Sequence, residues 1–312
     1  MIGPIALPSV VRQRAESLGP AGIEWLRGLP TQVIDLERRW QLTVGELLTG
    51  GTAAYVARAV TAAGDDVVLK IAVPDPEFAR QVRTLEKAAG RGYVELLEAD
   101  IGRGAVLMEA LGPSLDDLDW SPDRQIEAMC NLLTEAWKVA PDRDVTDSDG
   151  PFDKASSLHA FLSRLRDAVD APCNPEVIRM ALEFAERRAG AFDSARCVVV
   201  HGDPAPTNTL RVLSPRVGAP GGVVFVDPDG FLGDPEYDLG VILRGWCPQL
   251  LAGDAQAVTQ HYCEILAGHS GLDAQAIWEW GFVERVSTGL FCLSLGASEL
   301  GLPFLVTAEM LI

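Results

Sequence analysis

Two acidic residues and an amide follow two short apolar strands within residues 198–240. Asp203 comes directly after the run Val-Val-Val-His-Gly, Asn208 follows five positions later, and Asp227 ends the run Val-Val-Phe-Val. If the two runs are neighbouring strands, the three side chains converge on one point. A carboxylate can orient a hydroxyl group and accept its proton, while amide and carboxylate oxygens can hold Mg²⁺. The spacing therefore indicates a site for phosphoryl transfer.

Four more residues of this segment are expected near the site. We expect His201 to pack and to hydrogen-bond to the backbone, so that it holds the catalytic loop without reacting. Asp234 has the position of a helix N-cap, and Asp238, one turn later, can tie the start of that helix to the same loop. Asp229 lies close to the predicted metal site, where it either stabilises a turn or binds a cationic group of a substrate.

A lysine and a glycine-containing turn come earlier in the chain. Lys70 ends the apolar run Val-Val-Leu-Lys, where its charge can neutralise the phosphates of a nucleotide. The alternative is an edge-strand lysine that faces water. The turn that contains Gly50, Gly51 and Thr52 lacks the spacing G-x-G-x-x-G. It is therefore either an ordinary hairpin turn or a lid whose backbone N–H groups bind phosphate.

The elements that must position these residues begin with helices and continue with strands. Apolar residues at helical spacing predict two short helices in residues 10–40, broken at residues 28–30, which read Gly-Leu-Pro. Runs rich in β-branched residues, separated by glycine-containing turns, then predict antiparallel strands, with one helix after the third strand. The predicted strands cover residues 42–48, 53–60, 67–73, 93–98 and 104–110.

The rest of the chain is predicted to be mainly helical. Helical spacing occurs in residues 122–139, 154–169, 175–190, 254–268 and 274–296. The sequence thus predicts an α+β protein with two lobes. Residues 1–111 form a lobe of two leading helices and a five-stranded antiparallel sheet with its helix, and residues 112–312 form a mainly helical lobe that carries the hairpin with the acidic strand ends.

The charge of the chain limits its partners. Among 312 residues, 44 are acidic and 26 are basic, which gives a net charge of −18. Such a charge repels nucleic acids and anionic membrane surfaces and favours a small cationic partner, although acidity also serves solubility alone. Neither a nucleic acid, a membrane nor an obligate protein partner is indicated.

Cysteine usage and the apolar segments indicate a cytoplasmic protein. The six cysteines are scattered without a C-x-x-C pair, so we expect reduced thiols and no zinc site or disulfide framework. The N-terminus lacks the basic start and the long apolar core of a secretion signal. Residues 286–308 are apolar, but Glu299 and Pro303 interrupt them, so we expect a buried core helix and not a membrane span.

Two motifs carry a resemblance to a known family. The first is His-Gly-Asp-Pro-x3-Asn-Thr-Leu from residue 201, and the second is Val-Asp-Pro-Asp-Gly-x3-Asp-Pro-x-Tyr-Asp-Leu-Gly from residue 226. Together they resemble the aminoglycoside phosphotransferase family, whose fold is similar to that of protein kinases. Residues 25–30, 69–70 and 94–100 are similar to the branch that contains streptomycin 6-phosphotransferases and hydroxyurea kinases. The resemblance runs through nearly the whole chain.

The resemblance implies a role for each matching residue. Asp203 would be the catalytic base, Asn208 and Asp227 the ligands of Mg²⁺, and Lys70 the group on the nucleotide phosphates. Residues 108–111 match the hinge whose backbone receives the nucleobase, which makes Glu109 and Leu111 nucleotide-binding positions.

The chain departs from the family pattern at one point. Relatives place a helix glutamate beside the strand lysine, and the corresponding position here falls near Gln81. Glu77 or Glu86 would have to substitute, with Glu77 preferred. If neither reaches Lys70, slow turnover or an atypical nucleotide pocket is expected.

The implied activity is transfer of the γ-phosphoryl group of ATP or GTP, with Mg²⁺, to a hydroxyl of a small cationic molecule, with a streptomycin-like aminoglycoside favoured. This is an activity of the antibiotic-resistance type. One alternative is a kinase for another small metabolite, such as a sugar, an amino alcohol or hydroxyurea. Another is a nucleotide-binding regulator of the pseudokinase type. The missing helix glutamate and the glycine turn without the spacing G-x-G-x-x-G favour this alternative.

Overall fold

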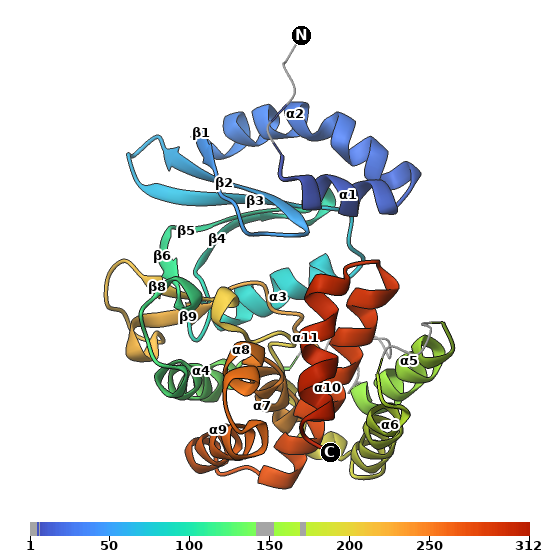
Figure 1. Cartoon of the computed structure of the whole chain (residues 1–312). Coiled ribbons are helices and arrows are strands. Elements are labelled where there is room, and N and C mark those ends of the chain that lie inside the picture. Colours follow the sequence, from blue (N-terminus) through green and yellow to red (C-terminus); the bar gives the residue numbers. More distant parts are fainter. Residues whose placement is uncertain (1–4, 6, 142–152, 169–172) are drawn as a thin grey trace.

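The computed structural model describes residues 5, 7–141, 153–168 and 173–312. Figure 1 shows two lobes, one above the other: a lobe built on a sheet, and a larger, mostly helical lobe. The predicted α+β class with two lobes is confirmed. The chain passes between the lobes where β5 (Ala105–Glu109) ends and β6 (Leu111–Ser114) begins. Leu111, which the sequence assigns to the upper lobe, begins β6, and β6 pairs with β8 (Thr209–Val212) of the lower lobe; the boundary after residue 111 stays a prediction.

The upper lobe is built on the predicted five-stranded antiparallel sheet, with the strand order β1-β2-β3-β5-β4. Because successive side chains of a strand point to opposite faces, the two faces of β3 differ. Leu69 and Ile71 are buried on the outer face, while Val68 and Lys70 face the lower lobe. Strand parity alone therefore directs Lys70 toward the space between the lobes. The other strands are β1 (Leu42–Leu47), β2 (Ala54–Thr61), β3 (Asp66–Ala72) and β4 (Leu96–Asp100).

Two helices, α1 (Ser9–Ser17) and α2 (Pro20–Trp40), cover the outer face of the sheet (Figure 1). They separate at Gly19, whose φ of 64° favours glycine. The predicted break at residues 28–30 is wrong, because α2 continues through Pro30. Burial of one face of α2 against the sheet outweighs the cost of a proline inside a helix, about 3 kcal/mol. The buried side chains of this face are Trp25, Leu29, Val33 and Leu36.

In its described residues, the lower lobe contains the five helices predicted from helical spacing, the helix that Asp234 is expected to cap, and two more. One long helix, α10, packs against α5, α6, α7, α9 and α11 and forms the centre of the lobe. A further helix, α3 (Phe78–Ala88), lies beneath the sheet (Figure 1). The helices of the lower lobe are α4 (Pro122–Ala136), α5 (Lys154–Ala168), α6 (Pro175–Gly190), α7 (Pro235–Arg244), α8 (Cys247–Ala252), α9 (Ala255–Ser270), α10 (Ala274–Ser294) and α11 (Ser298–Glu309).

Short strands carry the acidic residues. β8 (Thr209–Val212) lies between β6 and β9 (Val223–Phe225), while β7 (Val198–Val199) pairs with β10 (Leu232–Gly233). Thr209 at the start of β8 is opposite Phe225 at the end of β9. Residue 208 before β8 and residue 227 after β9 are therefore on the same edge of this antiparallel pair. The runs before Asp203 and Asp227 are not neighbouring strands, since β7 pairs with β10 and β9 pairs with β8. It is the β8–β9 pair that brings Asn208 and Asp227 together.

The apolar C-terminal segment is not the single buried helix that we expected. Residues 286–308 form the second half of α10 and most of α11, and the chain reverses near Gly296, whose φ is 75°. Glycine adopts this left-handed conformation without steric cost, so α11 can fold back along α10. Leu295 and Leu300 are each 67% exposed. Within the described residues, no helix has the length and apolar character that a bilayer crossing requires.

Candidate active site

A cleft of about 700 Å³ lies between the two lobes. Its upper wall comes from β2, β3, the end of β5 and the turn between β1 and β2, and its lower wall comes from β6 and the strand ends of the hairpin. Four residues that the sequence singles out line this one cleft: Lys70, Asp203, Asn208 and Asp227.

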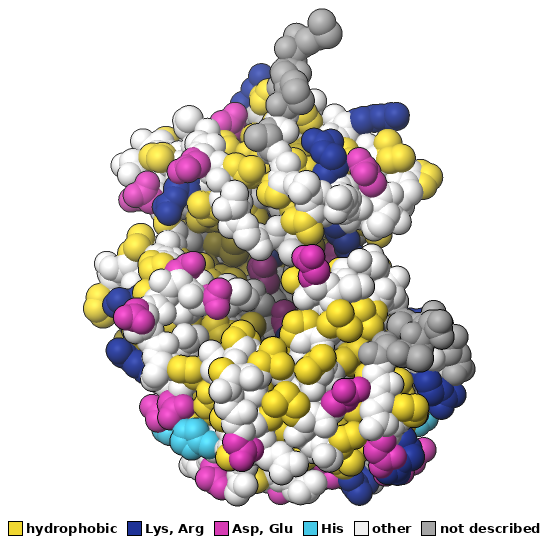
Figure 2. Space-filling model, in the orientation of Figure 1, with side chains coloured by type: hydrophobic (Ala, Val, Ile, Leu, Met, Phe, Trp, Pro, Cys, Tyr) yellow, Lys and Arg dark blue, Asp and Glu magenta, His cyan; other side chains and the backbone are white. Residues whose placement is uncertain are grey.

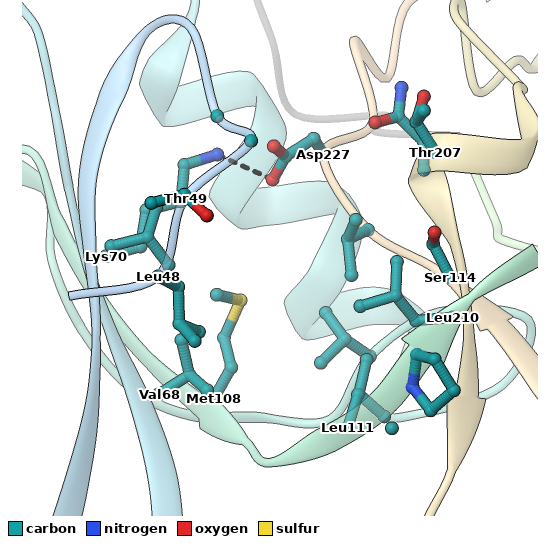
Figure 3. A pocket seen from close by; sticks show the side chains of 18 of the residues that line it. Leu48, Thr49, Val68, Lys70, Met108, Leu111, Ser114, Thr207, Leu210 and Asp227 are labelled. Carbon is teal, nitrogen blue, oxygen red and sulfur yellow. Dashed lines mark hydrogen bonds and ion pairs between the residues drawn. The ribbon is translucent and has the colours of Figure 1, made fainter. Parts of the chain in front are cut away.

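The two ends of the cleft differ in polarity (Figure 3). Val68 and Met108 from the upper lobe face Leu111 and Leu210 from the lower lobe, and these four side chains form an apolar slot. The ion pair of Lys70 and Asp227 lies at the other end. The cleft can thus accept a molecule with a flat apolar part and an anionic part.

Lys70 binds an acid from the lower lobe. Its Nζ is 2.6 Å from Oδ1 of Asp227, whose side chain remains 49% exposed. Asp227 has a φ of 57°, a left-handed conformation that few residues other than glycine and asparagine or aspartate adopt. Such local strain is common where a fold must aim a functional side chain. The conformation places the Asp227 carboxylate across the cleft from β3.

The preference for Glu77 as the partner of Lys70 is wrong. Glu77 precedes α3 and forms an ion pair with Arg80, one turn further along the chain. Gln81, at the position where the pattern expects a glutamate, donates to Oδ2 of Asp75 at 3.1 Å. The ion pair of Lys70 therefore joins it to the lower lobe and not to α3.

Asp203 receives two donors on its carboxylate. Nη2 of Arg244 is 2.6 Å from Oδ1, and Nδ2 of Asn208 is 3.2 Å from Oδ2. Burial disfavours the charged carboxylate, but the positive charge and hydrogen bond of Arg244 outweigh it and lower the pKa of Asp203. Nδ2 of Asn208 also donates to the backbone oxygen of Asp203 at 2.9 Å. Among the described residues no donor contacts Oδ1 of Asn208, so this oxygen can act as a ligand.

His201 is fully buried and supports the loop. One ring nitrogen, Nε2, is 2.9 Å from the backbone oxygen of Val226, and the other, Nδ1, accepts from the N–H of Asp203 at 3.1 Å. The ring packs edge-on to Phe225 with the centroids 4.6 Å apart. Burial lowers the pKa of His201 to about 4, so the ring is neutral near neutral pH. In the neutral form Nε2 donates and Nδ1 accepts, which satisfies both contacts.

Two acids lie at the start of α7, and one of them holds the same loop. Asp238 is buried and accepts three hydrogen bonds, from the N–H groups of His201 and Gly202 at 2.8 Å each and from Nε1 of Trp137 at 2.9 Å. Asp234 is the N-cap of α7, because its side chain accepts from the backbone N–H two residues later. Asp238 thus ties the backbone between β7 and Asp203 to the helix whose start Asp234 caps.

The glycine turn and the hinge occupy the upper and rear walls of the cleft. Gly50, Gly51 and Thr52 line it, and Gly50 has a φ of 112°. Glu109 and Leu111 line it as well. The conformation of Gly50 leaves the backbone of the turn close to the cleft, as a phosphate-binding turn requires.

The carboxylate of Glu109 is already engaged. It lies 2.5 Å from Nη2 of Arg216, which belongs to the loop between β8 and β9, and it accepts from the N–H of Glu95 at 2.8 Å. The expected contribution of Glu109 to nucleotide binding is therefore left to its backbone.

Asp229 lies behind the loop. Its N–H donates to the backbone oxygen of His201 at 2.6 Å, and its backbone oxygen accepts from Nε of Arg80 at 2.8 Å. Burial raises the pKa of its carboxyl group to about 6, although the charge of Lys154 opposes the shift. The backbone bonds agree with a turn-stabilising role, while binding of a substrate cation stays a prediction.

The donor atoms at the polar end fit Mg²⁺. This ion accepts a small number of carboxylate or amide oxygens and completes its shell with phosphate oxygens and water. Asn208 presents a free amide oxygen, and Asp227 presents a carboxylate that is half exposed. In the described part of the chain, no cluster of three or more His, Cys, Asp or Glu side chains forms a metal site by itself. The arrangement therefore suits an ion that arrives with phosphate groups.

The sequence pattern did not reveal Arg244, Glu284 and Tyr237, which extend the contacts of Asp203. Arg244 ends α7, and its Nη1 is 3.3 Å from Oε2 of Glu284 on α10. The other oxygen of Glu284, Oε1, accepts from the hydroxyl of Tyr237 at 2.9 Å. One signal was present, since Arg244 is the sole charged residue in the apolar run from Leu239 to Leu251. A lone charge in such a run needs a buried partner.

Acidic side chains gather inside the groove between the lobes. Figure 2 shows them within the hollow, above the surface of the helical lobe. Carboxylates of the described residues that line the cleft include those of Asp116, Asp117, Asp203 and Asp227. This distribution gives the groove the same sign as the whole chain.

The chain matches a family model and curated relatives over most of its length. Residues 44–274 match the model of the phosphotransferase enzyme family. The chain is 26% identical to streptomycin 6-kinase of Streptomyces glaucescens, over 92% of this chain and 90% of that kinase. It is 28% identical to a hydroxyurea phosphotransferase of Kitasatospora aureofaciens, over 91% of this chain and 78% of that protein.

A solved structure supports the fold. An aminoglycoside phosphotransferase from Streptomyces rimosus, in complex with ADP and streptomycin, superimposes with a TM-score of 0.53 at 18% identity, over 82% of this chain and 97% of that chain. The family model covers well over half of the residues, and it includes the glycine turn, the lysine strand and the acidic hairpin. The chain belongs to the phosphotransferase enzyme family.

Proposed function

We propose that this small-molecule kinase transfers the γ-phosphoryl group of ATP or GTP, with Mg²⁺, to a hydroxyl of a small cationic molecule. The observation that supports this most directly is the convergence of Lys70, Asp203, Asn208 and Asp227 on one cleft between two lobes. Each residue type suits one part of phosphoryl transfer, which depends on positioning and charge neutralisation more than on covalent chemistry.

The nucleotide would lie along the cleft. Its base would fill the apolar slot beside Val68 and Leu210, next to the backbone of residues 109–111. Its phosphates would extend below the glycine turn to Lys70. Asn208 and Asp227 would hold Mg²⁺, which neutralises phosphate charge when it is bound.

Asp203 would orient the acceptor hydroxyl and accept its proton. Its side chain is 48% exposed and lines the cleft, so its carboxylate can receive a hydroxyl group. The hydroxyl proton passes to Asp203 while the hydroxyl oxygen bonds to the γ-phosphorus. The bond between this phosphorus and the bridging oxygen breaks, and the nucleoside diphosphate leaves. No covalent enzyme intermediate is needed.

A streptomycin-like aminoglycoside is the favoured acceptor. The acidic groove, the net charge of −18 and the similarity to streptomycin 6-kinase support a cationic molecule. The similarity to a hydroxyurea phosphotransferase supports a second candidate, a small neutral hydroxy compound such as hydroxyurea. We also propose a cytoplasmic location, which the six free cysteines of the structure support.

A transfer assay tests the proposal. Purified protein with Mg²⁺ and ATP or GTP is incubated with a panel of aminoglycosides, hydroxyurea and small hydroxy compounds. We expect phosphorylation of a cationic acceptor, and we expect Asp203→Asn to lower kcat by about 10² or more. The control Asp254→Asn changes an aspartate that caps α9, and it should leave kcat unchanged.

Three other outcomes would change the conclusion. Transfer that is unaffected by Asp203→Asn would refute the assigned mechanism. Reaction of hydroxyurea alone would keep the chemistry and correct the acceptor. Tight Mg²⁺-dependent nucleotide binding without any turnover would favour the alternative function, a nucleotide-binding regulator of the pseudokinase type.

A further inference from the structure

The guanidinium of Arg244 contacts the candidate base, and none of the roles described above explains it. Nη2 of Arg244 is 2.6 Å from Oδ1 of Asp203, while Asn208 donates to the other oxygen at 3.2 Å. Each carboxylate oxygen thus has one donor, a cation on one side and an amide on the other. The carboxylate cannot rotate without losing one of these bonds, yet it stays half exposed to the cleft.

Arg244 is itself held by α10. Its Nη1 lies 3.3 Å from Oε2 of Glu284 and 3.5 Å from Oγ1 of Thr288. Glu284 is buried, and its second oxygen accepts from the hydroxyl of Tyr237 at 2.9 Å. The side chain of Arg244 is only 19% exposed. A guanidinium offers a rigid fork of donors, so it can bridge two carboxylates where an ammonium group offers a single point charge.

The backbone around Arg244 is fixed by a second arginine. Arg285 is buried on α10, and its Nη2 donates to the backbone oxygens of Leu243 at 3.0 Å and Gly245 at 3.1 Å. Its Nη1 donates to Oγ1 of Thr307 at 2.7 Å. The carbonyls of Leu243 and Gly245 lie at the C-terminal end of α7, where carbonyl groups lack helical partners and favour a positive charge. Main chain and side chain of Arg244 are therefore both fixed by α10.

We propose that Arg244 is a positioning residue for phosphoryl transfer: it fixes the carboxylate of Asp203 so that the remaining lone pairs face the acceptor hydroxyl, and Glu284 fixes Arg244. This inference rests on the proposed function. Arg244 does not belong to the described lining of the cleft around Lys70 and the glycine turn. Its loss should therefore affect the transfer step and leave nucleotide binding unchanged.

The test separates kcat from KM. For Arg244→Ala we expect kcat to fall by about 10²-fold, because small misplacements of a reacting group have effects of this size. We expect KM for the nucleotide to stay within about twofold, because uniform binding is untouched. Methylguanidine added to Arg244→Ala should restore part of kcat, since it can occupy the vacated space between Asp203 and Glu284. Glu284→Gln should lower kcat less than Arg244→Ala does.

Arg196 provides a matched control. Its Nη2 forms an ion pair of 2.5 Å with Glu236, a buried acid of α7 that lies outside the described lining of the cleft. Arg196→Ala should lower Tm without changing kcat, and methylguanidine should have no effect on it. If Arg244→Ala behaves in the same way, with lower Tm and unchanged kcat, the positioning role is refuted.

A structural readout separates this inference from the proposed function. If the wild-type protein transfers phosphate to no acceptor, the proposed function fails. Crystal structures of the wild type and of Arg244→Ala then decide the role of Arg244. An Asp203 carboxylate that has rotated or adopts two conformations in the variant supports the inference. A carboxylate with the same orientation in both structures overturns it.

Discussion

Asp203 shows how the neighbours of one residue prepare it for chemistry. His201 accepts from its backbone N–H, while Asn208 and Arg244 donate to its carboxylate. Asp238 in turn holds the backbone before it. Most of the orientation of Asp203 is thus set by residues that would never touch a substrate. Preorganisation of this kind lowers the barrier without any rearrangement at the moment of reaction.

The buried ring of His201 makes the stability of the protein depend on pH. Its pKa is lowered to about 4, while in the unfolded chain it returns to its usual value of about 6.5. The unfolded state therefore binds the proton first, and stability is lost as pH falls from about 6.5 toward 4. We expect this residue alone to contribute a loss of about 2 kcal/mol between about pH 7.5 and 5.

Urea unfolding at the two pH values measures this effect. His201→Gln removes the titrating ring, so the variant should lose about 2 kcal/mol less than the wild type over the same interval. Equal losses in both proteins would mean that His201 is not held neutral.

The separation of Glu77 from Lys70 leads to a second prediction. Within the described residues, Glu77→Gln breaks the ion pair with Arg80 and no contact with Lys70, so kcat/KM should stay within about twofold of wild type. Lys70→Met removes the charge beside Asp227 and the expected phosphate contact, so KM for the nucleotide should rise and kcat/KM should fall by about 10² or more. Steady-state kinetics with varied nucleotide concentration measures kcat and KM of both variants. A large loss of kcat/KM in Glu77→Gln would indicate that Glu77 is the partner of Lys70 after all.

At the scale of elements, the close approach of α7 and α10 builds the rear of the site. Glycines allow it: Gly240 on α7 faces Trp280 on α10, and Gly281 on α10 faces Leu243 on α7. A Cβ atom at Gly240 would overlap the Trp280 side chain and lie 2.8 Å from the backbone nitrogen of Gly281. The small residues therefore bring Arg244 within reach of α10.

We expect Gly240→Ala to destabilise the protein by about 1–3 kcal/mol, because the helices must move apart. Gly268→Ala is the control: Gly268 lies in α9 and has open space around the position of a Cβ, so alanine should be neutral or stabilising by up to about 1 kcal/mol. Thermal unfolding measures both. Equal Tm values for the two variants would show that the contact between α7 and α10 is loose.

At the scale of the whole molecule, local periodicity predicted the architecture well. Alternation along the strands and helical spacing indicated the five-stranded sheet, five helices of the lower lobe and the acidic hairpin. The break expected at residues 28–30 failed, since it followed from the local preferences of glycine and proline and ignored the packing of α2 on the sheet. The contact of Arg244 with Asp203 could not be predicted from local patterns either, because it joins residues 41 positions apart.

Charge acts over the same scale. The acidic groove and the net charge of −18 should attract a cationic acceptor, and salt screens such attraction within about 10 Å at 0.1 M. We therefore expect KM for an aminoglycoside to rise roughly threefold or more between about 0.05 and 0.5 M NaCl. KM for a neutral hydroxy acceptor should hardly change. A salt-independent KM for the aminoglycoside would contradict the electrostatic argument.

Lys70 and Asp203 come from different lobes, and we propose that they act on one reaction in one cleft. Comparing kcat/KM for phosphoryl transfer among the wild type, Lys70→Met, Asp203→Asn and the double variant tests it most directly. Residues that act as a unit show strongly non-additive losses. We predict that each single variant loses about 10² or more and that the double variant is scarcely slower than the slower single one. Single variants that transfer phosphate at the wild-type rate, or losses that simply multiply, would contradict the account.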